Sequence, residues 1–157
     1  MLFSIDEIKT KLQIWRESSK IIVFTNGCFD LLHKGHRSLL QTANNLGDIL
    51  IVGLNSDASV RILKGDKRPI ETQEKRARKL LKLEIVNAVC IFEDHTPREL
   101  IKLIRPNFLV KGGDYKKSKI VGSQTIKEWN GKVRIVPLLK GYSTSSIIKK
   151  NKREGLV

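Results

Sequence analysis

Two histidines three residues apart, His33 and His36, are the side chains whose types and spacing point most directly to chemistry. A helix is expected to begin near His33, so this spacing places both imidazoles on one helical face above the first turn. Free backbone N–H groups and the positive end of the helix dipole attract an anion there. Two imidazole donors then suit a phosphate chain that gains negative charge during reaction, and no nucleophilic side chain is required. The alternative is that each histidine only caps the helix or packs.

The segment that leads into this helix is predicted to lie against the same ligand. Gly27 lets the backbone turn tightly and approach a ligand without an intervening side chain. Gly35, between the two histidines, leaves space for a flat or bulky group. We therefore expect nucleotide or phosphate contacts along this segment from Asn26, Gly27, Cys28, Phe29 and Gly35.

A basic segment follows the second predicted strand and is expected to reach the same crevice. Lys64 and Arg68 are the residues assigned to phosphates there, Lys64 with a catalytic role. Arginine binds phosphate in a bidentate manner, and lysine acts as a mobile point charge. Taken alone, such residues are typical of a solvated loop, and only their position after a strand favours phosphate binding.

The fourth predicted strand runs into a pair of glycines. Gly112 and Gly113 are expected to present free backbone amides to an anion or a nucleobase. Asp114 could then hold ribose hydroxyls or an exocyclic amine, and Lys111 is assigned to the same nucleotide site. The alternative is an ordinary turn.

Hydroxyl residues precede the last predicted helix. Ser143, Thr144 and Ser145 are expected to form a second anion site, facing the first, from hydroxyls and amides at a helix start. The alternative is a simple helix cap made of serines.

Short apolar runs alternate with amphipathic stretches, which is the pattern of βαβ units around a parallel sheet. The predicted fold is α/β, a three-layer sandwich with a five-stranded, mostly parallel, doubly wound, Rossmann-like sheet. Thr96, Pro97 and Glu99 predict a capped helix start. Strands are expected at residues 21–25, 49–55, 86–92, 108–111 and 132–136, and helices at residues 5–16, 34–46, 72–83, 97–104, 121–129 and 143–150. In such sheets ligands bind beyond the carboxyl ends of the strands, where the strand order reverses.

Length and composition indicate one reduced, cytoplasmic domain over residues 1–157. It would comprise an N-terminal packing helix within residues 1–20, a catalytic core over residues 21–150 and a basic tail over residues 151–157. Cys28 and Cys90 form neither a disulfide scaffold nor a zinc motif. The apolar runs are strand-sized, and Asp6 and Glu7 stand where a signal peptide would be apolar, so neither a membrane span nor export is expected.

The net charge of +14 is concentrated in the C-terminal third, where residues 111–153 carry 12 basic and 2 acidic residues. An anionic partner is implied, unless the lysines simply form a solvated surface. A basic nucleic-acid-binding domain is the alternative from a different functional class. Against it, only nine residues are aromatic, and they are not interleaved with the basic residues as base stacking requires. We therefore expect no nucleic-acid partner.

Residues 25–36 resemble the signature of the HIGH-motif nucleotidyltransferases, which transfer a nucleotide from a nucleoside triphosphate to a phosphate and release pyrophosphate. Residues 143–145 are similar to the second, Ser-Thr-rich signature of that superfamily, with Ser145 in place of the usual threonine. Residues 55–70 and 109–115 are similar to the heptose 1-phosphate adenylyltransferases in particular. Leu138 stands where the glycerol-phosphate cytidylyltransferases usually carry an arginine. The resemblance spans residues 21–150.

This resemblance implies adenylyl transfer from ATP to D-glycero-D-manno-heptose 1-phosphate, giving ADP-heptose and pyrophosphate for lipopolysaccharide core or surface glycans. His33, His36 and Lys64 would stabilise charge on the phosphoryl oxygens, and residues 143–145 would hold pyrophosphate. Mg²⁺ would be held mainly by substrate phosphates and water, with no protein ligand. Related enzymes are commonly dimers, so a homodimer is expected. They are often fused behind a sugar kinase, and because this sequence shows no kinase domain, the free-standing form is expected. Glycerol-3-phosphate cytidylyltransferase or another nucleotide-sugar nucleotidyltransferase remains open.

Overall fold

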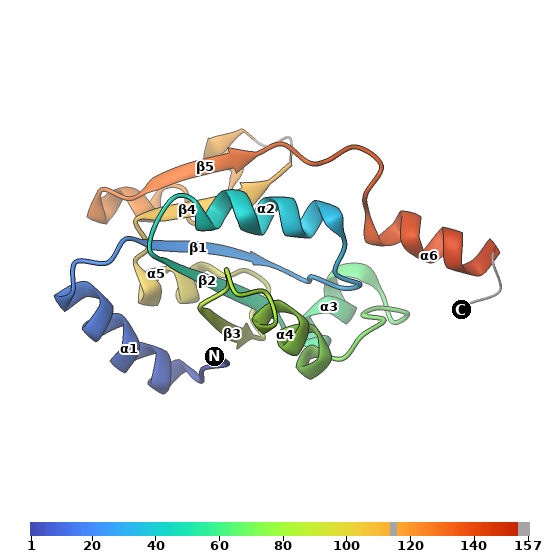
Figure 1. Cartoon of the computed structure of the whole chain (residues 1–157), viewed down its shortest axis with the longest axis horizontal. Coiled ribbons are helices and arrows are strands. Elements are labelled where there is room, and N and C mark those ends of the chain that lie inside the picture. Colours follow the sequence, from blue (N-terminus) through green and yellow to red (C-terminus); the bar gives the residue numbers. More distant parts are fainter. Residues whose placement is uncertain (114–115, 154–157) are drawn as a thin grey trace.

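A five-stranded sheet forms the centre of the molecule, and each strand runs parallel to its neighbours. The computed structural model describes residues 1–113 and 116–153. The strand order is β3-β2-β1-β4-β5 (Figure 1). The strands are β1 (Ile22–Gly27), β2 (Ile49–Asn55), β3 (Ala88–Phe92), β4 (Phe108–Gly112) and β5 (Lys132–Val136). The predicted doubly wound sheet is confirmed, and it is entirely rather than mostly parallel.

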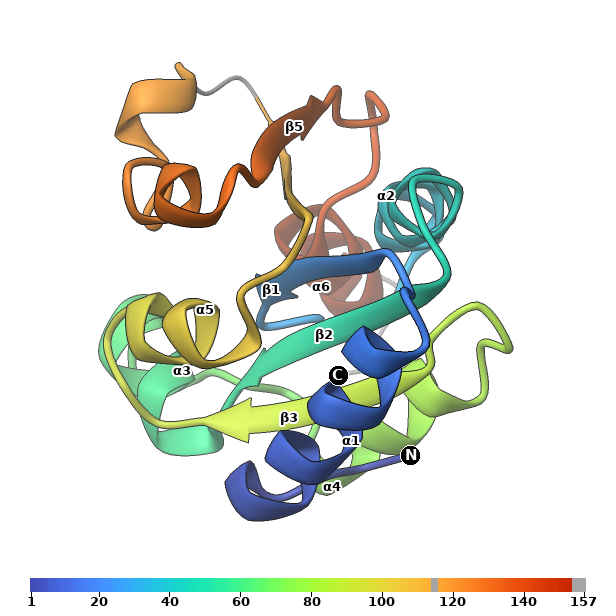
Figure 2. The same ribbon diagram turned by 90° about the vertical axis from the view of Figure 1, so that its left-hand side faces the viewer.

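Helices cover both faces of this sheet and complete a three-layer sandwich. They are α1 (Ile5–Glu17), α2 (Lys34–Asn44), α3 (Asp57–Lys64), α4 (Gln73–Leu81), α5 (Arg98–Ile104) and α6 (Thr144–Arg153), with the 3₁₀ helices η1 (Lys117–Lys119) and η2 (Thr125–Trp129). Figure 2 shows α5 and α2 on opposite sides of the sheet. Among the described residues, no helix is long and apolar enough to cross a membrane.

Alternation of side chains along the strands divides the core between the two faces. Ile22 and Phe24 of β1 pack in one cluster with residues of α1 and α5, whereas Val23 packs in the other with residues of α2 and α4. This period of two follows from the strand geometry, in which successive side chains point to opposite faces. Because both faces are covered, the strands read as nearly continuous apolar runs.

The strand order reverses between β1 and β4, so the ligand crevice of this fold class opens at their carboxyl ends. Thr25 is in register with Val110, which places the next residues, Asn26 and Lys111, at neighbouring strand ends. The fold therefore positions two of the predicted site segments side by side.

Two local predictions were wrong, and one helix was missed. The helix expected over residues 121–129 is the 3₁₀ helix η2, which begins only at Thr125. Thr96 does not cap α5, because Pro97 occupies the N-cap position with no side-chain hydrogen bond and Glu99 pairs with Lys102 instead. No helix was predicted for the basic segment after β2, which begins as α3 with Ser56 as its N-cap.

Candidate active site

The two histidines stack at the start of α2. His33 is the N-cap residue, and its ring lies 3.7 Å from that of His36, with an angle of 20° between the ring planes. His33 Nδ1 accepts the backbone N–H groups of Gly35 at 3.1 Å and His36 at 3.4 Å. His36 Nδ1 in turn accepts the backbone N–H of His33 at 3.4 Å. Both capping and the predicted common face are therefore present.

This arrangement determines which ring nitrogen carries the proton. Because each Nδ1 accepts a backbone N–H, a neutral imidazole must hold its proton on Nε2. Burial lowers the pKa of His33. Burial, followed by the charges of His33 and Lys64, lowers the pKa of His36 to about 3. At neutral pH both rings are thus neutral Nε2–H donors. Two of the amides expected to bind an anion directly are used instead to orient the His33 ring.

Phe29 and the two glycines fix the position of these rings. The Phe29 side chain is only 4% exposed, and its ring centroid lies 5.2 Å from that of His36. Phe29 therefore packs against His36 and is nearly buried, whereas a nucleotide contact was predicted for it. A Cβ at Gly27 would lie 3.2 Å from the Phe29 ring, and one at Gly35 would lie 3.0 Å from the His33 ring. The space beside Gly35 is occupied by His33 and Tyr142 rather than left open for a ligand.

A buried carboxylate ties this loop to the segment after α3. Asp30 accepts hydrogen bonds from Arg68 Nε at 2.8 Å and from the backbone N–H groups of Ile70 at 2.9 Å and Glu71 at 3.0 Å. Burial alone would raise the pKa of Asp30, but these bonds and the charge of Arg68 hold the pKa below its ordinary value. The Arg68 side chain is itself only 12% exposed. Arg68 Nε is thus engaged by Asp30, while Nη2 of the same guanidinium is buried without a hydrogen-bond partner among the described residues. The phosphate contact expected of Arg68 stays a prediction.

Sequence reasoning missed a second buried cation, Arg76 of α4. Its guanidinium donates to the carbonyls of Cys28 at 2.6 Å and Glu71 at 3.0 Å and to Asp57 Oδ1 at 2.8 Å. Arg76 is fully buried and joins three segments of the site. A signal was present in the sequence, since Arg76 stands four residues before Leu80 on the apolar face of its helix.

The start of α6 is attached to the same loop by one buried hydroxyl. Thr144 Oγ1 donates to the backbone carbonyl of Asp30 at 2.8 Å, so this hydroxyl is not free for phosphate as predicted. Ser143 Oγ caps the helix by accepting the N–H of Ser146 at 3.1 Å. Ser145 is exposed. Figure 1 shows α6 beyond the carboxyl ends of the strands, on the side where α2 begins.

Lys111 and Asn26 line a cavity of about 140 Å³ at the carboxyl ends of β4 and β1, together with Pro97, Lys119, Ile120 and Val121. Burial lowers the pKa of Lys111. The Gly113 N–H donates to the Val136 carbonyl at 3.0 Å and is therefore not the free amide that was predicted. A Cβ at Gly112 would lie 3.2 Å from Leu138. Asp114 lies outside the described residues.

The structure therefore brings together His33, His36 and the α6 start, with Lys64 close enough to influence the pKa of His36. Within residues 1–113 and 116–153, no group of three or more His, Cys, Asp or Glu side chains could hold a metal ion. No metal ligand set is therefore assigned to the described residues. Neutral donors around a helix start can instead stabilise a phosphate chain.

The fold is of the doubly wound α/β class, and the candidate site lies at the carboxyl ends of its strands. A family model described as cytidylyltransferase-like matches residues 24–154. The chain belongs to this family, and the resemblance drawn from its motifs is confirmed.

The curated relatives are longer proteins. A bifunctional protein HldE from Helicobacter pylori (strain Shi470) is 57% identical over 132 residues, which are 84% of this chain and 28% of the relative. Another bifunctional protein HldE, from Koribacter versatilis, is 53% identical over 136 residues, which are 87% of this chain and 28% of the relative. The chain thus spans less than a third of these relatives.

Solved structures share the fold. A lipopolysaccharide core biosynthesis protein from Thermoplasma volcanium is 25% identical, with a TM-score of 0.64 over 79% of this chain and 99% of that one. A pantoate-beta-alanine ligase from Francisella tularensis is 17% identical and has the same TM-score over 97% of this chain and 77% of that one. The second likeness concerns the fold alone.

Proposed function

We propose that this protein transfers the adenylyl group of ATP to D-glycero-D-manno-heptose 1-phosphate, giving ADP-heptose and pyrophosphate. The stacked pair of neutral histidines carries the proposal, because it presents two Nε2–H donors above the start of α2. The motif resemblance to the heptose branch and the identity to the HldE proteins support this choice of substrates. The relative named as a lipopolysaccharide core biosynthesis protein fits the use of such a product.

In the proposed reaction an oxygen of the sugar phosphate attacks the α-phosphorus of ATP. A new P–O bond forms, the bond between the α-phosphorus and the bridging oxygen breaks, and pyrophosphate leaves with the electron pair. His33 and His36 donate from Nε2 to the phosphoryl oxygens, whose negative charge increases in the transition state. The phosphate nucleophile is already ionised, so the protein need not supply a general base.

Lysines and hydroxyls around the histidines would hold the substrates. Lys64, at the end of α3, contributes a positive charge near His36. Ser143, Ser145 and the backbone of Thr144 would contact the departing pyrophosphate. Lys111 and Asn26 would contact substrate in the cavity between the ends of β1 and β4. Mg²⁺ would arrive with ATP, bound by its phosphates and by water.

Pyrophosphate release tests the reaction and its substrates together. ATP, CTP and GTP are each paired with heptose 1-phosphate and with glycerol 3-phosphate, in the presence of Mg²⁺. Release only from ATP with heptose 1-phosphate is the expected result. Release from CTP with glycerol 3-phosphate would overturn the substrate assignment and leave the mechanism intact. No release from any pair, by protein shown to be folded, would overturn both.

A cytoplasmic homodimer is part of the same proposal. The reaction needs ATP, and related nucleotidyltransferases are commonly dimeric. Sedimentation velocity over a range of concentrations is expected to show a dimer, and a monomer at all concentrations would contradict this part alone.

A further inference from the structure

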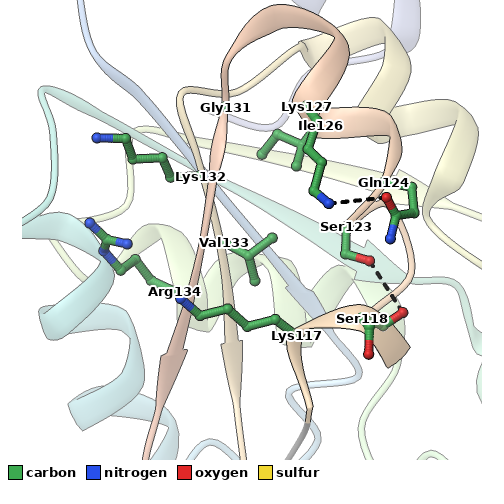
Figure 3. Close-up of a pocket in the computed structure, with 10 residues that line it drawn as sticks. All are labelled: Lys117, Ser118, Ser123, Gln124, Ile126, Lys127, Gly131, Lys132, Val133 and Arg134. Atoms are coloured by element: carbon green, nitrogen blue, oxygen red, sulfur yellow. Dashed lines mark hydrogen bonds between the residues drawn. The ribbon is translucent and has the colours of Figure 1, made fainter.

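A groove of about 400 Å³ lies beside β5 and shares no lining residue with the candidate active site. It runs between the outer edge of β5 and the segment that carries η1 and η2 (Figure 3). Val133 and the almost completely buried Ile126 are its apolar lining residues, and Gly131 also lines it. This groove has no role in the reaction proposed above.

The backbone of β5 has hydrogen-bonding groups that point away from the sheet. Lys132 N–H donates to the Asn107 carbonyl at 2.9 Å, and the Val136 carbonyl accepts the Gly113 N–H at 3.0 Å. Because backbone groups alternate along a strand, the even-numbered residues of β5 bond to β4 and the odd-numbered ones face outward. Val133 and Ile135 therefore direct their N–H and C=O groups outward, and no described residue pairs with them.

Cations surround this edge on both faces. Lys132 and Arg134 extend to one side of β5, whereas Val133 points to the other side, where Lys117 and Lys127 line the groove (Figure 3). Residues 116–134 contain six basic residues and one acidic residue. Lys127 donates to Gln124 at 3.1 Å, and no lining residue carries a carboxylate. A ligand here meets four positive charges around an apolar strip.

From these features we infer that the β5 edge is a docking site for an extended acidic segment of another protein, which adds to the sheet as a sixth strand. Acidic side chains on one face of the added strand would meet Lys132 and Arg134. Apolar side chains on its other face would enter the groove beside Val133. Strand addition of this kind takes its affinity from main-chain hydrogen bonds and its specificity from alternate side chains.

Charge argues against a second copy of this chain at the same edge. Two β5 strands paired edge to edge would bring Lys132 and Arg134 of both copies together, and like charges directly opposite are destabilising. Outward N–H and C=O groups also favour a peptide over a nucleic acid, which would use the cations but not the strand backbone.

The test uses the whole chain and a labelled six-residue peptide of alternating glutamate and valine, followed by fluorescence anisotropy. The same peptide with lysine in place of glutamate is the matched probe. Only the acidic peptide is expected to bind. In the double variant Lys132→Glu/Arg134→Glu its affinity is expected to fall by on the order of tenfold, while the basic peptide gains affinity. The charge-matched variant Lys9→Glu/Lys82→Glu, on other parts of the surface, should bind as the unmodified chain does.

Amide hydrogen exchange separates strand addition from simple charge attraction. On peptide binding, the amides of Val133 and Ile135 are expected to become protected, whereas that of Arg134, already bonded to β4, should not change. Val133→Pro removes one outward donor and should weaken binding without loss of pyrophosphate release, since Pro is tolerated where the N–H faces solvent.

Three results would overturn the inference. One is acidic-peptide binding without protection of Val133 and Ile135. Another is binding of a single-stranded oligonucleotide in preference to the peptide. The third is self-association of the chain that itself protects these two amides.

Discussion

The starts of α2 and α6 lie next to each other at the candidate active site, yet the protein holds them in very different ways. The segment before α2 is tied to its surroundings by buried charges, with Asp30 bonded to Arg68 and the Cys28 carbonyl bonded to Arg76. In α6, Thr144 is the one buried residue among those described, and its hydroxyl makes one buried hydrogen bond to the Asp30 carbonyl.

This difference matches two separate requirements of the proposed reaction, which are stabilisation of the transition state and binding and release of pyrophosphate. The histidines that would act on the transition state need a fixed geometry, because preorganised donors require no rearrangement when charge develops. The hydroxyls that would hold the departing pyrophosphate must also release it. Asp30 serves both parts, since its side chain organises the first and its carbonyl anchors the second.

The largest expected effect is on stability, from Asp30→Asn. The substitution leaves Arg68 buried without its counter-charge and turns an amide N–H₂ toward backbone donors. Breaking a buried pair in this way should lower the free energy of unfolding by about 3–5 kcal/mol. Urea unfolding measures this change. Asp6→Asn is the control, because Asp6 is 92% exposed in its ion pair with Lys9 and should change stability by less than about 1 kcal/mol. Equal effects of the two substitutions on stability would contradict the conclusion that buried charges hold the segment before α2 in place.

The next effect is on turnover, from His33→Asn and His36→Ala. Each removes one Nε2–H donor and should lower turnover by about 10²–10³-fold, the scale for one charge-stabilising donor. Asparagine is a good N-cap, so His33→Asn keeps the cap of α2 and should unfold at nearly the same urea concentration as the unmodified chain. His95→Ala, at an exposed histidine, is the control and should retain full turnover. Normal turnover of His33→Asn would show that His33 serves only as a cap.

Thr144→Val should have a smaller and more local effect. It removes the hydrogen bond to the Asp30 carbonyl while keeping a β-branched side chain. Amide exchange in α6 is expected to accelerate by on the order of tenfold, and the KM for ATP should rise more than kcat falls. Thr42→Val, on the exposed face of α2, is the matched control. Unchanged exchange in α6 would mean that other contacts hold this helix.

The last effect is a dependence of stability on pH. The folded state lowers the pKa of His33, and lowers that of His36 from 6.5 to about 3. The unfolded chain therefore binds more protons, and stability is lost as the pH falls from about 6.5 toward the folded values. His36→Ala should flatten the dependence between pH 6.5 and 4 in urea unfolding. A steeper dependence of stability on pH in this variant would contradict the conclusion that His33 and His36 are neutral in the folded protein.

The strands and the histidine pair were predictable because both depend on local patterns. The run over Ile49–Asn55 is apolar and strand-sized, and its predicted limits match β2. His33 and His36 are three residues apart at a helix start, so local capping bonds between the N-cap residue His33 and His36 are enough to bring their rings together. The short helix α3 was missed because exposed Ile62 and Leu63 interrupt any clear apolar face.

The sequence by itself determined a parallel α/β sheet, the strand ends that carry the site and the two histidines with their common face. Only the tertiary structure decided which polar groups remain open to a ligand. Arg68, Thr144 and the Gly113 amide were all assigned to a ligand, and each donates to a partner distant in sequence or in another strand. The physical reason is that a buried donor or acceptor must be satisfied, and its partner is known only once the chain has folded.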